Sequence, residues 1–229
     1  MSTQQSLQHT GRSFETIRIR RYLVNGKAST QNELAAQPFI VAGVDLPDQE
    51  VAYGFANEEA LCRWAAGSRH ADRFARAIGT MKLGQQLEGT EIGSRAVRKI
   101  QAATERLSAE LEELSRETGL AMGSSEFLIE AAMHRSTLEP PLFDPALLFD
   151  KVIDPGLPPV FGGAVFPVNS IIPTFFGFND KASGALVLGL CTLFDKTFFR
   201  GQTAFLFGAA RFVLSDIAYD NRAASGIAT

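Results

Sequence analysis

The sequence is poor in cysteine and has no excess of basic residues. Only Cys62 and Cys191 are present in 229 residues, which is too few for the disulfide framework of a small secreted domain. Free thiols favour a reducing compartment, so we expect a cytoplasmic protein. The 22 Lys and Arg residues against 25 Asp and Glu residues give a net charge of −3. This balance argues against a nucleic-acid partner, which would require a basic surface.

The short motifs of common enzyme classes are also missing. The chain contains no Gly-x-Gly-x-x-Gly, no Walker loop, no His-Glu-x-x-His and no Gly-x-Ser-x-Gly. Cys62 and His70 are eight residues apart, which on one helix is about 12 Å and too far for a nucleophile and its base. We expect Cys62 in the core and His70 at the surface, while His9 and His134 have no evident ligand partners. The sequence therefore favours a non-catalytic protein, and leaves a site in residues 13–143 as an alternative.

A membrane segment is not expected either. The N-terminus lacks the apolar core of a secretory signal, and its polar residues 1–12 predict a disordered tail. Residues 155–179 carry no charge and are long enough to span a bilayer. They contain five prolines, however, which are incompatible with a continuous helix. We therefore expect buried strands and turns there.

The composition changes along the chain. Residues 144–229 hold twelve of the eighteen Phe residues and no Glu, whereas residues 1–143 hold every Glu, the single Trp and all three His. Glu favours helices, and Phe with Gly and Asp favours strands joined by tight turns. These differences predict an α+β protein. A helix-rich domain with a few strands covers residues 13–143, and an all-β domain follows, with the seam near the prolines of residues 139–142.

The N-terminal half contains three strand patterns and a helix start. Strands are expected over residues 13–24, 37–44 and 50–55. Asn57 is a suitable N-cap, followed by acidic residues in the first turn. This helix is expected to break near Gly67. Its inward-facing residues are predicted to be Leu61, Trp64, Ala65, Phe74 and Ile78.

The clearest helix pattern runs from Ser94 to Thr118. Its apolar residues recur at heptad spacing between Val97 and Leu114, and Gly119 provides a natural stop. Such a seam can form an intramolecular helical hairpin, which is the simpler interpretation, or a homodimer. A shorter helix is expected over residues 124–134. We recognise no family in residues 1–143.

The C-terminal half contains an internal repeat. The tetrapeptide Leu-Phe-Asp-Lys occurs at residues 148–151 and again at 193–196. Each copy is followed by an aromatic residue and a short loop of Asn and Asp, at 178–184 and 219–226. Two such matches in the same order indicate two repeats, of residues 147–188 and 191–229. Each is long enough for four short strands.

The second repeat also shows the spacing of a folded-over hairpin. Phe194, Phe199 and Gly201 form an aromatic-x4-aromatic-x-Gly pattern, in which the glycine permits a positive φ and the aromatic rings pack across the bend. The first repeat keeps Phe149 and Gly156 but has Asp154 at the second aromatic place. With the paired Asn/Asp loops, this pattern resembles the βγ-crystallin family, over residues 147–229 only. The resemblance implies a double Greek-key sandwich.

The loops have the chemistry of a calcium site. Calcium prefers six to eight oxygen ligands, and the first loop offers an amide, a carboxylate and a hydroxyl within five residues. The resemblance to calcium-binding microbial members implies that the two loops lie side by side and share two ions. The predicted ligands are Asn179, Asp180, Lys181, Ser183, Asp220, Asn221 and Arg222, with Lys181 and Arg222 acting through their carbonyls. Ala224 lacks the expected hydroxyl, which predicts one competent calcium site and one weakened site.

Alternatives remain open at this point. The Asn and Asp residues can instead simply cap turns without binding a metal. The function favoured by the sequence is a non-catalytic calcium-binding protein with a structural, stress-related or binding role. The other hypotheses are a calcium-independent interaction module, such as a peptidase inhibitor or toxin-like effector, and an enzyme with its site in residues 13–143.

Overall fold

The computed structural model describes residues 16–44, 46–120, 127, 146–149, 165–166, 171–172, 180–187 and 189–228. Several predicted features lie outside these ranges. They are the tail of residues 1–12, the seam at 139–142, all of the helix predicted at 124–134 except Phe127, and most of the uncharged segment 155–179. Within the described ranges, no helix has both the length and the apolar composition that a membrane span requires.

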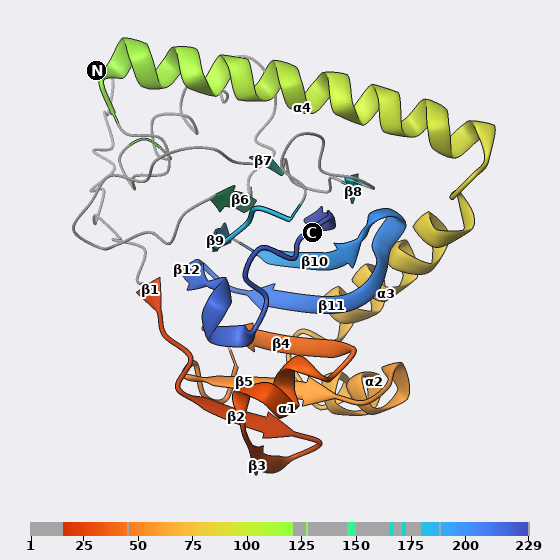
Figure 1. The fold of residues 1–229 in the computed structure, drawn as a ribbon, viewed down its shortest axis with the longest axis vertical. Coiled ribbons are helices and arrows are strands. Elements are labelled where there is room, and N and C mark those ends of the chain that lie inside the picture. Colours follow the sequence, from red (N-terminus) through yellow and green to blue (C-terminus); the bar gives the residue numbers. More distant parts are fainter. Residues whose placement is uncertain are drawn as a thin grey trace, which may run out of the picture.

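The described elements confirm an α+β fold with most helices in the N-terminal half (Figure 1). The helices are α1 (Gln31–Ala35), α2 (Glu58–Ala66), α3 (Ala71–Gln86) and α4 (Glu91–Thr118), with 3₁₀ turns η1 (Thr197–Phe199) and η2 (Leu214–Ile217). The N-terminal strands are β1 (Thr16–Ile17), β2 (Arg21–Val24), β3 (Lys27–Ser29), β4 (Phe39–Gly43) and β5 (Val51–Phe55). The C-terminal strands are β6 (Ala146–Phe149), β7 (Val165–Phe166), β8 (Ile171–Ile172), β9 (Gly184–Val187), β10 (Leu190–Lys196), β11 (Arg200–Phe207), β12 (Ala210–Val213) and β13 (Ser225–Ala228).

The C-terminal strands form a double Greek key. In the first repeat, β6, β7 and β9 share one sheet, while β8 crosses to the other. In the second repeat, β10, β11 and β13 share the other sheet, while β12 crosses back. The four C-terminal strands of each sheet therefore follow the same order. The third strand of the opposite repeat comes first, and the fourth, first and second strands of the sheet's own repeat follow. Neighbouring strands among these four are antiparallel. This exchange confirms that the sequence repeat is a structural repeat.

The N-terminal strands extend both of these sheets. β4 pairs in parallel with β11, with Phe39 opposite Thr203, and β5, β2 and β3 continue outward from β4. β1 pairs in parallel with β12 at the edge of the other sheet. The result is one sheet of five strands and one of eight. The larger sheet therefore contains strands from both sides of the compositional change near residue 144.

The centre of the larger sheet, at β4 and β11, is buried on both faces. Alternate residues of β4 and β11, such as Ile40 and Leu206, face the smaller sheet in one apolar core. Their neighbours Val41 and Phe205 face α2 and α3 in a second apolar core. Burial on both faces explains why β11 contains a continuous apolar run, Ala204–Phe207, instead of alternating polar and apolar residues.

The predicted helix start and break in the N-terminal half are confirmed. The Asn57 side chain accepts a hydrogen bond from the amide of Ala60 at the start of α2, which ends at Gly67. Leu61, Ala65, Phe74 and Ile78 are buried as predicted, and Trp64 is half-buried. The single strand expected over residues 13–24 is instead β1 and β2, separated by residues 18–20; residues 13–15 lie outside the described ranges.

Helix α4 differs from its prediction in where it starts. It begins at Glu91, three residues earlier than expected, because the Thr90 hydroxyl caps it through the amide of Gly93. It ends as predicted at Gly119, whose φ is 68°. It turns away from α3 and contacts β7 and β8 (Figure 1). The predicted helical hairpin stays a prediction, because most of the helix expected at 124–134 lies outside the described residues. Near its end, Leu111 and Leu114 pack on Phe127 and Leu120.

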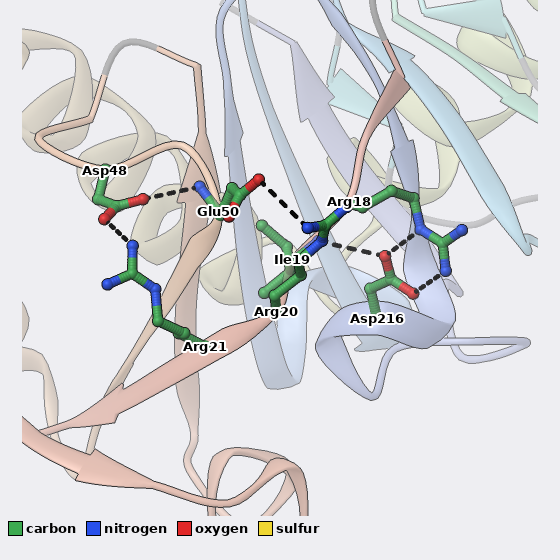
Figure 2. A network of polar contacts seen from close by, with 7 residues as sticks. All are labelled: Arg18, Ile19, Arg20, Arg21, Asp48, Glu50 and Asp216. Carbon is green, nitrogen blue, oxygen red and sulfur yellow. Dashed lines mark hydrogen bonds and ion pairs between the residues drawn. The ribbon is translucent and has the colours of Figure 1, made fainter.

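An arginine-rich segment joins β1 to β2 and fixes the N-terminal half to the second repeat (Figure 2). The Arg18 guanidinium makes a two-pronged contact with the Asp216 carboxylate in η2, at 2.7 and 3.1 Å, and the amide of Ile19 donates to the same carboxylate. Arg20 and Arg21 pair with Glu50 and Asp48 of the loop before β5. The segment therefore holds η2 against β1 and β2.

Candidate functional site

The two Asn/Asp loops of the repeats lie side by side. The amide of Asp180 donates to the carbonyl of Ala223 at 3.0 Å, and the amide of Asn221 donates to the carbonyl of Ala182 at 2.8 Å. Asp180 and Asn221 occupy equivalent places in the two repeats, as do Ala182 and Ala223. The two hydrogen bonds are therefore equivalent, because each loop donates to the other from the same position in its repeat. The loops are related by an approximate two-fold axis. We call residues 180–183 and 220–224 the paired loops.

Backbone conformation supports the same symmetry. Asp180 has a φ of 55° and Asn221 a φ of 51°, both in the left-handed region. Asp and Asn tolerate this conformation better than other non-glycine residues because their short polar side chains bond locally. The residue types therefore suit the turn whether or not a metal binds there.

Side-chain oxygens from opposite loops meet at one side of this junction. The Ser183 hydroxyl is 3.4 Å from the Asn221 amide oxygen, and Ser183 is only 7% exposed. The Asn221 amide nitrogen in turn donates to the Asp220 carboxylate at 3.1 Å. On the symmetry-related side, Ala224 occupies the place of Ser183 and contributes no hydroxyl. The two sides of the junction are thus chemically unequal.

Ser225 has a structural role in the second repeat. Its hydroxyl accepts a hydrogen bond from the amide of Phe199 at 3.1 Å and donates to the carbonyl of Lys196 at 2.7 Å. Ser225 is completely buried, so its oxygen is committed to the backbone of the preceding hairpin. The first repeat has Gly184 at this place.

The hairpin that Ser225 holds has the folded-over geometry predicted from the sequence. We define the folded hairpin as residues 194–202. The rings of Phe194 and Phe199 meet edge to face, 5.4 Å between centroids, and Gly201 has a φ of 79°. A Cβ at Gly201 would lie 1.8 Å from a carboxylate oxygen of Asp195, so only glycine fits. The matching hairpin of the first repeat lies outside the described residues, apart from the backbone of Phe149.

Sequence reasoning missed the polar contacts that join the folded hairpin to the second loop. Asp195 accepts from the amide of Gln202 at 2.7 Å and from the Arg222 guanidinium at 2.8 Å. Arg222, predicted to act through its carbonyl, therefore also has a side-chain role beside the loop. The only signal for Asp195 was its place in the repeated Leu-Phe-Asp-Lys tetrapeptide.

Tyr219 is buried beneath the second loop. Its hydroxyl donates to the carbonyl of Gln202 at 2.9 Å, and its ring lies 5.7 Å from the Arg222 guanidinium. Burial raises the pKa of Tyr219 well above its usual value because the phenolate would lose its hydration. The ring therefore anchors the loop as a neutral group.

The donor set of the paired loops suits calcium better than a softer metal. The described loop residues offer hydroxyl, amide, carboxylate and backbone carbonyl oxygens and no imidazole or thiolate. No group of three or more His, Cys, Asp or Glu side chains suited to a metal occurs among the described residues. The Ser183 side of the junction fits a hard cation, whereas the Ala224 side lacks one oxygen. Asn179, the remaining predicted ligand, lies outside the described residues.

Cys62 and His70 lie in different surroundings. Contrary to expectation, Cys62 is exposed. His70 is half-buried, and its ring lies 5.1 Å from that of Phe207. His70 lines an open pocket of about 620 Å³ that Cys62 does not line. The other pocket residues are Val44, Leu46, Pro47, Trp64, Gly67, Ser68 and Arg69.

Comparisons with known proteins give matches only among solved structures. No family model and no curated protein matches the chain. A βγ-crystallin from an archaeon aligns over 38% of this chain and 98% of its own, with 20% identity and a TM-score of 0.30. A structure described under the evolution of the eye lens βγ-crystallin domain fold aligns over 36% of this chain and 82% of its own, with 18% identity and a TM-score of 0.30. The exchanged strand order and folded hairpin independently give the described residues between 146 and 228 the βγ-crystallin-like sandwich expected from the sequence.

Proposed function

We propose that the paired loops bind a single calcium ion on their Ser183 side and that the protein is a non-catalytic calcium-binding protein. The observation that carries this proposal is the reciprocal pairing of the loops, which directs the Ser183 hydroxyl and the Asn221 amide oxygen toward each other from opposite repeats. One ion held there would join the two repeats at their junction.

The affinity is expected to be modest. Within the described loops the carboxylates are those of Asp180 and Asp220, so neutral oxygens must complete the six to eight ligands that calcium prefers. The role we propose is structural: the ion stabilises the sandwich by binding the folded state. At a calcium concentration one hundred times Kd, this stabilisation is about 2.7 kcal/mol.

Thermal unfolding of the full chain tests this proposal. Millimolar calcium should raise Tm by roughly 5–10 °C relative to excess chelator, given the usual shift per kcal/mol for a chain of this size. Calorimetric titration should give one ion per chain, and magnesium should bind far more weakly because it demands a stricter geometry. Unchanged Tm and no heat of binding would leave the loops as simple Asn/Asp turns.

Two serine variants test which side of the junction binds. Ser183→Ala should abolish the calcium-dependent rise in Tm, because it removes the hydroxyl from the competent side. Ala224→Ser should raise the stoichiometry from one ion toward two by restoring the missing hydroxyl. Ser215→Ala is the matched control, since Ser215 is an exposed serine in η2. Equal calcium affinity in Ser183→Ala and the control would refute the assignment of the site.

A further inference from the structure

The folded hairpin of the second repeat is covered by helix α3. The ring of Phe199 packs directly on the backbone of Gly84, where an added Cβ would lie 2.2 Å from two ring carbons. The Gln85 side chain donates to the carbonyl of Phe199 at 2.6 Å, and Arg200 pairs with Glu88 just beyond α3. The hairpin and α3 are thus joined by close packing at Gly84, by a hydrogen bond at Gln85 and by an ion pair at Glu88.

The same hairpin holds the second of the paired loops on its other side. The amide of Ala224 donates to the carbonyl of Phe194 at 2.7 Å. Ser225 bonds the hairpin backbone at Phe199 and Lys196, and Arg222 pairs with Asp195. The backbone of Phe199 is therefore hydrogen-bonded on both sides: its amide donates to the Ser225 hydroxyl, and its carbonyl accepts from the Gln85 side chain.

A second set of contacts links the hairpin to the N-terminal strands. The buried Gln202 side chain donates to the carbonyls of Ala35, the last residue of α1, and of Gln37, in the connection to β4, at 2.9 and 2.5 Å. The backbone of Gln202 accepts from Tyr219 and donates to Asp195. Displacing the hairpin would break bonds to the loop and to the N-terminal half together.

We propose that the folded hairpin couples the paired loops to helix α3, so that the helical layer formed by α2 and α3 is the part of the protein that responds to an ion at the loops. This inference rests on the proposed calcium site for its ligand. Close-packed interfaces transmit displacement because they have little free volume. Coupling between two sites is reciprocal, so a change confined to α3 must alter the loops.

Two glycines of α3 provide a matched test in the full-length protein. Gly84→Ala places a methyl group against the Phe199 ring, whereas Gly79→Ala adds the same methyl group where nothing lies within 4 Å. Both substitutions bring the same gain in helix propensity. Hydrogen exchange without calcium is measured on peptides covering residues 194–203 and 219–226. We expect exchange in both peptides to be at least about fivefold faster in Gly84→Ala and unchanged or slower in Gly79→Ala.

The second readout is calcium affinity, measured by titration calorimetry. Gly84→Ala should weaken calcium binding by about fivefold or more, and Gly79→Ala should leave it unchanged. If Gly84→Ala fails to fold, Gln85→Ala is compared with Gln86→Ala, which alters an exposed neighbour of the same type.

The outcomes separate the coupling from the calcium proposal. Faster exchange in the hairpin peptide without any change in the loop peptide would overturn the coupling. Absence of calcium binding by the unaltered chain would overturn the proposed function, while the exchange comparison would still test the link between α3 and the loops.

Discussion

At the scale of single residues, Tyr219 connects stability to pH. Its ring is completely buried and its hydroxyl is bonded to the Gln202 carbonyl, so the folded state keeps the phenol protonated. The unfolded chain releases this proton near pH 10. Above that pH the unfolded state binds fewer protons than the folded state, and stability must fall as pH rises.

We predict that the free energy of unfolding decreases progressively above about pH 10 and that Tyr219 ionises only on unfolding. Denaturant titrations at several alkaline pH values, with absorbance of tyrosinate as a second signal, measure both effects. Tyr219→Phe should be less stable at neutral pH by about 1 kcal/mol, because the hydrogen bond is lost, and should show a flatter alkaline decline. An equally steep decline in this variant would assign the effect to Tyr22, Tyr53 or another group.

At the scale of elements, α4 depends on a left-handed residue for its end. Gly119 has a φ of 68° with nothing within 4 Å of an added Cβ, so the strain of a substitution there would come from the backbone alone. Gly119→Ala should destabilise the protein by about 1 kcal/mol. Gly79→Ala, in the interior of α3 with equally open space, should instead stabilise it by up to about 1 kcal/mol. Thermal unfolding followed by circular dichroism measures both, and shifts of the same sign would contradict the explanation.

At the scale of the whole molecule, the shared eight-stranded sheet predicts one cooperative unfolding transition. Each half contains its own reporter: Trp64 packs against Phe74 in the helical layer, and Cys191 is buried in β10. In a Cys62→Ser background, the denaturant midpoint from tryptophan fluorescence should coincide with that from reaction of Cys191 with a thiol reagent. Two separate midpoints would show that the halves unfold independently despite β4 and β11.

The sequence contained enough local information to predict the elements that depend on local rules. The Asn57 cap, the break at Gly67 and the stop at Gly119 follow from backbone conformation and capping. The folded hairpin followed from the spacing of two aromatic residues and a glycine, and the pairing of the loops from the resemblance of the repeat to the βγ-crystallin family. The exposure of Cys62 could also have been predicted from the sequence, because Cys62 lies about 100° around the helix from the buried Leu61.

Long-range pairings could not be predicted in the same way. The apolar run of β4 shows that the strand is buried but does not specify β11 as its partner, because any buried strand would present a similar pattern. The contact between Gly84 and Phe199 depends on where α3 crosses the sheet. For the same reason, the link from the paired loops to α3 became visible only in three dimensions.

The parallel pairing of β4 with β11 also constrains how the chain reaches its native state. Phe39 of β4 pairs with Thr203 of β11, which lies 164 residues (203 − 39) further along the chain, so the larger sheet cannot close until β11 has been synthesised. Pairings of such wide sequence separation slow folding and leave an open strand edge in the meantime. Nascent chains released before residue 200 should therefore depend on chaperones to prevent aggregation.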